Sequence, residues 1–366
     1  DQLLYLLDRA TALHQAGDYD ESNKDFLIAD RLAEIKDYTS LSTEAATLLT
    51  SEEIKHYKGE EFEYVLISQY LALNFLMLQK PEDALVECRR VNHKLHRLIS
   101  EGKRKYALSP MARYLAAAIY EDRREWNDAY VDYQGMRELL PGLPFLGEDL
   151  YRLAWRNRNR ADMERWASEY QLSGETQRRI RETADDPEIF VIVENGRAPQ
   201  KEPHPSWASI PHFVPKYNPT DHVDVLAIAG ATAGEPGVVP ARSRSYQLFD
   251  VEKAAIRNLD EKFGPLLAKK IAGLVAKEVI SDQISRRTDP LIGFLVWLGL
   301  HASDTADTRS WLTLPKDFQV ARIRLPREGG SFTVRFTPAA ATGSEKIIRF
   351  EAGKRGSRVF VPIRLF

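Results

Sequence analysis

The sequence predicts an α+β protein with an all-helical N-terminal domain, residues 1–184, followed by a smaller α+β domain, residues 185–366. Three observations support this prediction. Apolar residues recur at helical spacing through most of residues 1–183, and a helix-pair pattern occurs three times within the first 140 residues. Short strand patterns with alternating apolar residues then dominate the C-terminal half. The change in pattern at Asp185-Asp186-Pro187 marks the predicted domain boundary.

The clearest copy of the helix-pair pattern is carried by Tyr120, Ala129, Tyr133, Met136 and Pro141. A tetratricopeptide-type unit needs a large residue on its first helix and a small residue where the second helix crosses it closely. An aromatic residue follows one turn later, and a proline stops the second helix. The pattern therefore predicts tetratricopeptide-like units, which stack and leave a concave surface for a partner. An irregular helical domain with small residues at tight crossings is the alternative.

Two looser copies precede this one. Their small residues are Ser22 and Ala84, which match Ala129 in the clearest copy. The interval from Ser22 to Ala84 is 62 residues, and that from Ala84 to Ala129 is 45 residues. A strict repeat has a period of about 34 residues, so we expect inserted helices or long loops between the copies. The turns are predicted at Gly17-Asp18-Tyr19 and Gln79-Lys80-Pro81.

A further helix pair is predicted over residues 148–157 and 161–170. Its polar face is rich in arginine, and the last unit of a stacked array must present a soluble outer side. We therefore expect this pair to cap the array. The arginines of that face are Arg152, Arg156, Arg158, Arg160 and Arg165.

The C-terminal half reads as strands around one long helical segment. A buried strand is predicted over residues 188–194 and another over 223–229, with a proline-rich loop over 197–221 between them. Residues 251–287 predict one long helix or a broken pair, because Gly264-Pro265 interrupts them. Four strands then predict an antiparallel meander or half of a small sandwich, with Pro362 placing the last strand at an edge. They span residues 318–325, 331–336, 346–350 and 358–365.

Composition excludes several classes of function. Lys plus Arg number 51 and Asp plus Glu 53, for a net charge of −2. Nucleic-acid binding needs a clustered basic excess, so we expect no nucleic-acid partner. The single cysteine, Cys88, permits no internal disulfide and is expected to be a buried apolar residue. The longest uncharged run, Leu291–Leu300, is too short to span a bilayer and predicts a buried helix or a membrane-touching segment.

No motif points to catalysis. His204, His212 and His222 cluster around the proline-rich loop, but their spacing fits no known zinc pattern. The sequence has no Gly-x-Ser-x-Gly nucleophile motif and no phosphate-binding Walker loop. We therefore predict no catalytic, cofactor-binding or metal-binding residues, and no cofactor.

Asp307, Arg309 and Trp311 alternate in the segment that leads into the first C-terminal strand. A partly buried network between the aspartate and the arginine would fix this helix-to-sheet junction. A corner that binds a ligand or partner is the functional alternative.

Three separated motifs together resemble a poorly characterised family of bacterial envelope lipoproteins with tetratricopeptide-like N-terminal halves. They lie in residues 70–90, 193–199 and 307–315. The resemblance implies export and attachment through an N-terminal lipid, whose cysteine would lie upstream of Asp1. It implies no established activity; such proteins tend to act as scaffolds or regulators beside wall-synthesis or surface-assembly proteins.

We therefore predict a non-enzymatic scaffold or regulator of the cell envelope, periplasmic and anchored to the outer membrane, that binds a protein partner through its helical groove and domain junction. One alternative is an envelope hydrolase or ligand-binding enzyme that acts on glycans near the proline-rich loop. Another is a cytoplasmic tetratricopeptide adaptor. The residues predicted to bind the partner are Asn74, Arg89, Asn92, Tyr120, Asp307, Arg309 and Trp311.

Overall fold

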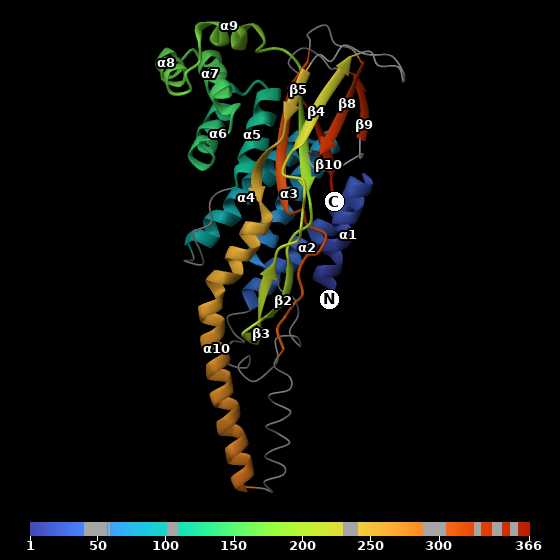
Figure 1. The fold of residues 1–366 in the computed structure, drawn as a ribbon, viewed down its shortest axis with the longest axis vertical. Coiled ribbons are helices and arrows are strands. Elements are labelled where there is room, and N and C mark those ends of the chain that lie inside the picture. The colour runs from blue at the N-terminus through green and yellow to red at the C-terminus, as the bar shows by residue number, and fades with distance from the viewer. Residues whose placement is uncertain are drawn as a thin grey trace. The chain divides into compact units, whose positions relative to one another are not determined.

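The computed structural model describes residues 1–39, 57, 59–100, 109–229, 241–287, 305–325, 331–338, 346–351 and 358–366. Figure 1 shows the described helices and strands in chain order. They form two compact units that interleave along the chain. Unit 1 combines Asp1–Ile67, Arg197–Lys216 and Val251–Lys316. Unit 2 combines Ser68–Gly196, Tyr217–Asp250 and Asp317–Phe366. This partition differs from the ranges 1–184 and 185–366, which stay a prediction.

Unit 1 begins with a helical hairpin, α1 (Gln2–Ala16) and α2 (Tyr19–Thr39). The carboxylate of Asp1 accepts a hydrogen bond from the backbone N–H of Leu3 at 3.2 Å and so caps the start of α1. Gly17 ends the helix in the left-handed conformation, with φ 84°. The unit also holds the start of α3 (Glu61–Met77), a strand pair and α10 (Val251–Arg287).

The proline-rich segment of unit 1 is a β-hairpin rather than the predicted loop. Its strands are β2 (Gln200–His204) and β3 (Trp207–Val214), and Pro203 lies opposite Pro211. A two-stranded sheet has only edge strands, so each proline can sit where no ladder hydrogen bond is required of it. Helix α10 is continuous and carries Pro265 inside it, which decides between the two predictions for this segment in favour of one long helix.

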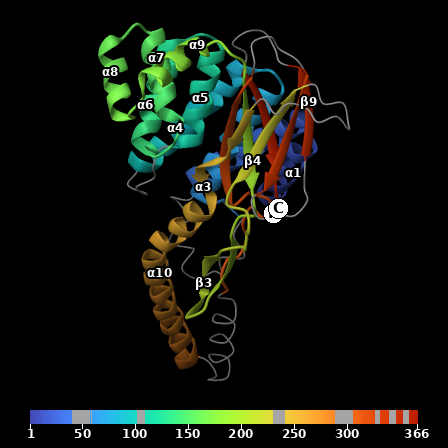
Figure 2. The same cartoon turned by 45° about the horizontal axis from the view of Figure 1, so that its top comes forward.

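Unit 2 contains the rest of α3 and a run of helices that Figure 2 shows gathered together. Helix α4 packs on α5, and α6 packs on α7. Ser109 caps α5 and Pro110 occupies its first turn, where the missing N–H costs nothing. The helices that follow α3 are α4 (Pro81–Ser100), α5 (Pro110–Asp122), α6 (Trp126–Leu139), α7 (Leu146–Arg156), α8 (Arg160–Glu169) and α9 (Gly174–Glu182).

Four helix pairs share one turn geometry. In each, the residue two positions before the second helix has a positive φ: Gly17, Gln79, Arg124 and Arg158. The N–H of the next residue bonds to the carbonyl five residues earlier, at 2.8–2.9 Å. These are the 6→1 bonds of a Schellman motif, which satisfies carbonyls at the end of the first helix. The predicted pairs, including the one after Pro144, are therefore helix pairs with a common turn.

The small residues of the pattern lie where the helices pack. Ser22, Ala84 and Ala129 are fully buried. The Ser22 hydroxyl donates a hydrogen bond to the Ala10 carbonyl oxygen at 2.7 Å, which requires the second helix to lie very close to the first. Cys88 is buried, as predicted.

The described strands of unit 2 form two four-stranded sheets. One has the order β10-β1-β7-β6 and the other β5-β4-β8-β9. Strand β1 pairs in parallel with β10 and antiparallel with β7. The strands of the first sheet are β1 (Glu188–Asn195), β6 (Tyr246–Asp250), β7 (Asp317–Arg324) and β10 (Arg358–Arg364). Those of the second are β4 (Val223–Ala229), β5 (Ala241–Arg244), β8 (Ser331–Pro338) and β9 (Lys346–Glu351).

The four C-terminal strands exist as predicted, but the prediction that they form an antiparallel meander is wrong. Strands β7 and β10 flank β1, whereas β8 and β9 belong to the other sheet. A completely buried strand such as β1 needs partners on both edges, and those partners come from far along the chain. Pro362 lies on β10, an outer strand of its sheet among the described strands, as predicted.

The two sheets pack as a sandwich. Val191, Ile323 and Val361 of the first sheet lie in one buried cluster with Val225 and Phe336 of the second. The opposite face of the first sheet is covered by helices. The rings of Phe190 and Phe318 lie there against Tyr114 and Tyr70, each pair 5.8 Å apart.

Candidate functional site: an arginine-lined pocket in unit 2

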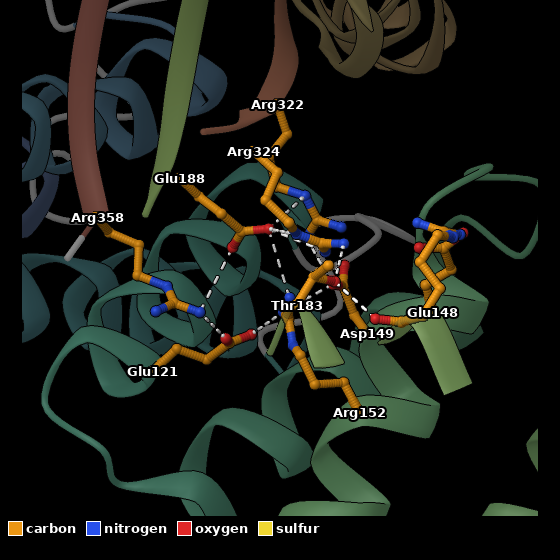
Figure 3. A network of polar contacts seen from close by, with 10 residues as sticks. Glu121, Glu148, Asp149, Arg152, Thr183, Glu188, Arg322, Arg324 and Arg358 are labelled. Atoms are coloured by element: carbon orange, nitrogen blue, oxygen red, sulfur yellow. Dashed lines mark hydrogen bonds and ion pairs between the residues drawn. The ribbon is translucent and has the colours of Figure 1, made fainter. Parts of the chain in front are cut away.

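A buried ion network occupies one end of the helix-covered sheet face. Arg152 of α7 donates to Glu121 of α5 at 2.6 Å and to Asp149 at 2.8 Å. It lies 3.4 Å from Glu188, the first residue of β1. Figure 3 shows the carboxylates of this network placed between guanidinium groups. The predicted role of Arg152 on a soluble capping face is wrong, because its side chain is only 3% exposed.

The strands supply three more arginines to the network. Cross-strand pairing places Arg324 and Arg358 on either side of Glu188. Arg324 lies 3.1 Å from Glu188, Arg358 lies 2.5 Å from Glu121, and Arg322 lies 2.5 Å from Asp149. Alternation along β7 puts Arg322 and Arg324 on the same face. Helices α5 and α7 cover that face, so a strand pattern typical of a solvent-facing side is buried here.

The network has four guanidinium groups and three carboxylates. Burial opposes ionisation of Glu188, but Arg322 and Arg152 outweigh it and hold its pKa well below the ordinary value. Burial likewise opposes ionisation of Glu121, whose pKa is lowered by Arg152 and Arg358. Desolvation lowers the pKa of Arg324, and the neighbouring charges of Arg152 and Arg322 add to this effect.

A pocket of about 410 Å³ opens beside this network. This volume falls within the range of about 300–1,000 Å³ that small-molecule sites occupy. Arg322, Arg324 and Glu188 form its inner wall. The described residues that line the rest are Pro144, Phe145, Glu148, Arg242, Ser243, Arg244 and Tyr246.

The outer arginines of the pocket come from β5 and are accessible. The side chains of Arg242 and Arg244 are 68% and 50% exposed. Arg242 lies 3.0 Å from Asp224, and Arg244 lies 4.0 Å from Asp221 and 2.6 Å from Nδ1 of His222. Exposed ion pairs of this kind are worth only about 0–1 kcal/mol, so both guanidinium groups can exchange partners at little cost.

The chemistry of the pocket suits binding of an anion. Its described lining has four arginines and two glutamates, and none of these residues is His, Cys or Lys. Guanidinium groups stay protonated and donate paired hydrogen bonds to carboxylates or phosphates. Glu188 is held ionised by its arginines, so it is a poor proton carrier at neutral pH.

The predicted partner-binding residues are divided between the two units. Asn74, Arg89, Asn92 and Tyr120 lie in unit 2, and Asp307, Arg309 and Trp311 lie in unit 1. In unit 2, the exposed Arg89 donates to the Tyr120 hydroxyl at 2.7 Å, so these two are a real surface pair between α4 and α5. Asn74 is fully buried and Asn92 partly buried.

In unit 1, Asp307 and Arg309 form the predicted network. Arg309 bonds to both carboxylate oxygens of Asp307, at 2.8 and 2.7 Å, and lies 3.2 Å from the Asp1 carboxylate. Trp311 is only 1% exposed. Its backbone N–H donates to the buried Glu63 carboxylate at 2.9 Å. These contacts are those of a residue in the core of unit 1.

The three histidines of the predicted cluster also lie in different units. His204 and His212 face each other across the β2–β3 hairpin with their rings 5.4 Å apart, and His204 packs on Phe263 of α10. His222 lies in unit 2. Within the described ranges, no group of His, Cys, Asp and Glu is arranged to hold a metal ion. Likewise no described helix is long and apolar enough to cross a bilayer. The Leu291–Leu300 run lies outside the described residues.

Sequence reasoning missed all four arginines of the pocket, and it placed Arg152 of the adjoining ion network on the capping face. Two signals were available: Arg322 and Arg324 alternate in a strand, and so do Arg242 and Arg244. From the sequence alone, each pair indicates the solvent-facing side of a strand. The elements that pack on that side are known only from the structure. Comparisons of the chain with protein-family models, curated protein sequences and solved structures find no match. The chemistry of the pocket is therefore the basis for a functional proposal.

Proposed function

We propose that this protein is a non-enzymatic, protein-binding scaffold that takes an anionic group of its partner in the arginine-lined pocket of unit 2. The observation that carries the proposal is the excess of arginine over carboxylate in that pocket. Arg242 and Arg244 are exposed enough to meet a partner, while Arg322 and Arg324 are fixed from behind by Glu188 and Asp149. Preorganised donors of this kind bind a carboxylate at a low entropic cost.

The helix pairs support a scaffold. We propose that they are tetratricopeptide-like units, since all four share the same Schellman turn. The turn residues Arg124 and Arg158 lie 34 positions apart, which matches the tetratricopeptide period. Such arrays serve mainly to present surfaces to other proteins. The envelope location, with a lipid anchor, is part of the proposal through the resemblance of the three motifs.

Citrate provides the first test. A ligand that binds only the folded state raises the unfolding temperature. At a concentration of 100 times its Kd, it adds about 2.7 kcal/mol to the free energy of unfolding. We expect citrate to stabilise the wild-type protein but not the double variant Arg242→Gln/Arg244→Gln. The control is Arg178→Gln, which removes a 67%-exposed arginine of α9. Equal stabilisation of all three proteins would mean that citrate binds outside the arginine-lined pocket.

The second test concerns the partner. The wild type, Arg242→Gln/Arg244→Gln and Arg178→Gln are immobilised and exposed to solubilised bacterial envelope proteins. The proposal requires a protein that the wild type and the control retain and the double variant loses. Retention of identical proteins by all three would refute the pocket as the binding site.

A further inference from the structure

The arginine-lined pocket also has an aromatic side. Phe145, which precedes α7, and Tyr246 of β6 line it together with Pro144. The rings of Phe145 and Tyr246 meet edge to face with their centroids 5.9 Å apart, and both residues are half-buried. A ligand that fills the pocket therefore meets an apolar surface as well as guanidinium groups.

The aromatic and the charged surfaces adjoin. The guanidinium carbon of Arg322 lies 5.0 Å from the centroid of the Phe145 ring. Tyr246 pairs with Val320 across β6 and β7. Alternation places Arg322 and Arg324 on the same face of β7 as Val320. A ligand can therefore contact both surfaces if its apolar part lies only a few bonds from its anionic part.

The charge around the pocket favours a singly charged anion. The buried network has four guanidinium groups and three carboxylates, so it carries one positive charge when all of them are ionised. One carboxylate neutralises this charge, whereas a doubly charged phosphate leaves a negative charge in a partly enclosed site. The other charged residues of the described lining occur as ion pairs, which are Arg242 with Asp224, Arg244 with Asp221, and Glu148 with Arg179.

We propose that the pocket binds the C-terminal residue of the protein partner, with its α-carboxylate against the arginines and an apolar side chain against Phe145 and Tyr246. This inference rests on the proposed function and deepens it. A C-terminal residue carries its carboxylate and its side chain on the same carbon atom, so it meets both surfaces at once. An internal aspartate or glutamate offers the aromatic rings only its short methylene chain. Capture of a C-terminal carboxylate is a recurring mode of peptide recognition.

A free amino acid has the same carboxylate and side chain, but it adds an ammonium group. The four arginines of the lining disfavour that second charge. In a peptide an uncharged amide replaces the ammonium group, so the end of a chain suits the electrostatics of the pocket better.

The aromatic residues also have a purely structural use, because Phe145 packs on Tyr114 with the ring centroids 5.6 Å apart. Packing of this kind requires no ligand. The two roles differ in one measurable respect. Only an aromatic surface that the ligand contacts makes the affinity depend on the side chain of the ligand.

The test uses the full chain and fluorescence anisotropy, with a fluorophore on the N-terminus of each peptide. The first peptide is Gly-Ser-Gly-Ser-Gly-Phe with a free carboxylate, and the second is its C-terminal amide. The third ends in alanine instead of phenylalanine. The fourth, Gly-Ser-Gly-Glu-Gly-Ser with an amidated C-terminus, carries one internal carboxylate. Free phenylalanine and the unlabelled first peptide serve as competitors.

We expect the first peptide to bind. Its amide should bind about tenfold or more weakly, because hydrogen bonds to a charged group are lost. The alanine peptide should bind about tenfold more weakly, because it leaves the aromatic surface uncovered. The internal-glutamate peptide should be weaker by a similar factor for the same reason.

Three variants locate the binding. Arg242→Gln/Arg244→Gln should weaken binding of the first peptide by about tenfold, and the control Arg178→Gln should not. Tyr246→Ala should weaken the first peptide more than the alanine peptide, because only the first has a ring to place against Tyr246. A general loss of structure would weaken both peptides equally, and the four peptides with the wild type test the inference without any variant.

Four results would overturn the inference. Equal binding of the free acid and its amide would exclude the α-carboxylate, and equal binding of the phenylalanine and alanine peptides would exclude the aromatic surface. If free phenylalanine competes as well as the unlabelled peptide, the site is one for a free amino acid. If no peptide binds, the inference is wrong as well.

The proposed function has a separate outcome. It stands without the inference if the internal-glutamate peptide binds as tightly as the first peptide and the double variant loses both. It fails together with the inference if no peptide binds and citrate does not stabilise the wild type.

Discussion

The indole Nε1 of Trp311 donates a hydrogen bond to the Thr11 hydroxyl at 2.9 Å, although 300 residues separate the two in the chain. The same nitrogen lies 3.0 Å from the Thr313 hydroxyl, and the ring packs against Phe26. A segment near the end of unit 1 is thereby fixed to its first two helices. The physical role of this tryptophan is to hold the core of unit 1 together, and this has a measurable consequence.

Trp311→Ala should destabilise unit 1 by about 3–5 kcal/mol, because it leaves a large cavity and an unpaired polar site. Trp311→Phe should cost less, about 1–2 kcal/mol, since it keeps an aromatic ring but loses the indole hydrogen bonds. Leu312→Ala is the matched control, because Leu312 is 57% exposed and should change stability by less than about 0.5 kcal/mol. Urea denaturation measures all three. Equal effects at the two positions would contradict the core assignment.

The shared turn geometry predicts opposite effects of two glycine substitutions. Arg158 is exposed and adopts φ 58°, so Arg158→Gly should stabilise unit 2 by about 0.5–1 kcal/mol by relieving backbone strain. Gly17→Ala should destabilise unit 1 by a similar amount. A Cβ at Gly17 would meet no atom within 4 Å, so the cost comes from φ 84° alone. Thermal unfolding measures both. A loss of stability in Arg158→Gly would show that the arginine side chain matters more than the strain.

The ion network predicts acid sensitivity. The pKa of Glu188 in the folded protein lies well below the ordinary value of 4.5. The unfolded chain therefore takes up this proton first. The stabilisation is fully present above about pH 4.5 and is lost as the pH falls toward the folded-state pKa, at up to about 1.4 kcal/mol per pH unit. Burial raises the pKa of Asp149, so that group titrates in the opposite sense and offsets part of the loss.

Urea unfolding of the wild type and Glu188→Gln, compared between pH 3 and 6, measures this slope. The variant should be less stable at pH 6 but should lose less stability on acidification. Carboxyl carbon NMR shifts of the wild type provide a measurement that needs no variant. They should show Glu188 still ionised below pH 4.5, and titration at or above that value would refute the assignment.

The Cys88 thiol is buried among the helices of unit 2. This burial raises its pKa. A buried, protonated thiol is a poor nucleophile, so a disulfide reagent should not modify the native protein on the timescale of minutes. Because Cys88 is the only cysteine, the reagent should react with one thiol per chain, and only after unfolding. Fast reaction in native buffer would mean that α4 opens readily.

Local sequence patterns were sufficient to locate most elements. The apolar run at 188–194 predicted β1, the small residues Ser22, Ala84 and Ala129 predicted three helix pairs, and Pro362 predicted an outer strand. Each of these features depends on backbone propensity or on contacts between neighbours in the chain, and both leave a periodic signature. The Asp307–Arg309 pair could likewise be predicted, since its members lie two positions apart in the chain.

Strand partners and the pocket were decided only by tertiary structure. In the sequence, Arg152 and Arg322 each lie on the polar side of an amphipathic element, and such a side normally faces solvent. They are buried because Glu121, Asp149 and Glu188 meet them from elements as far as 173 residues away in the chain. A buried charge is tolerated only when such partners surround it, and no local pattern records partners at that distance. The sequence by itself determined the elements, whereas the covering of one sheet face by α5 and α7 decided which of its arginines are buried.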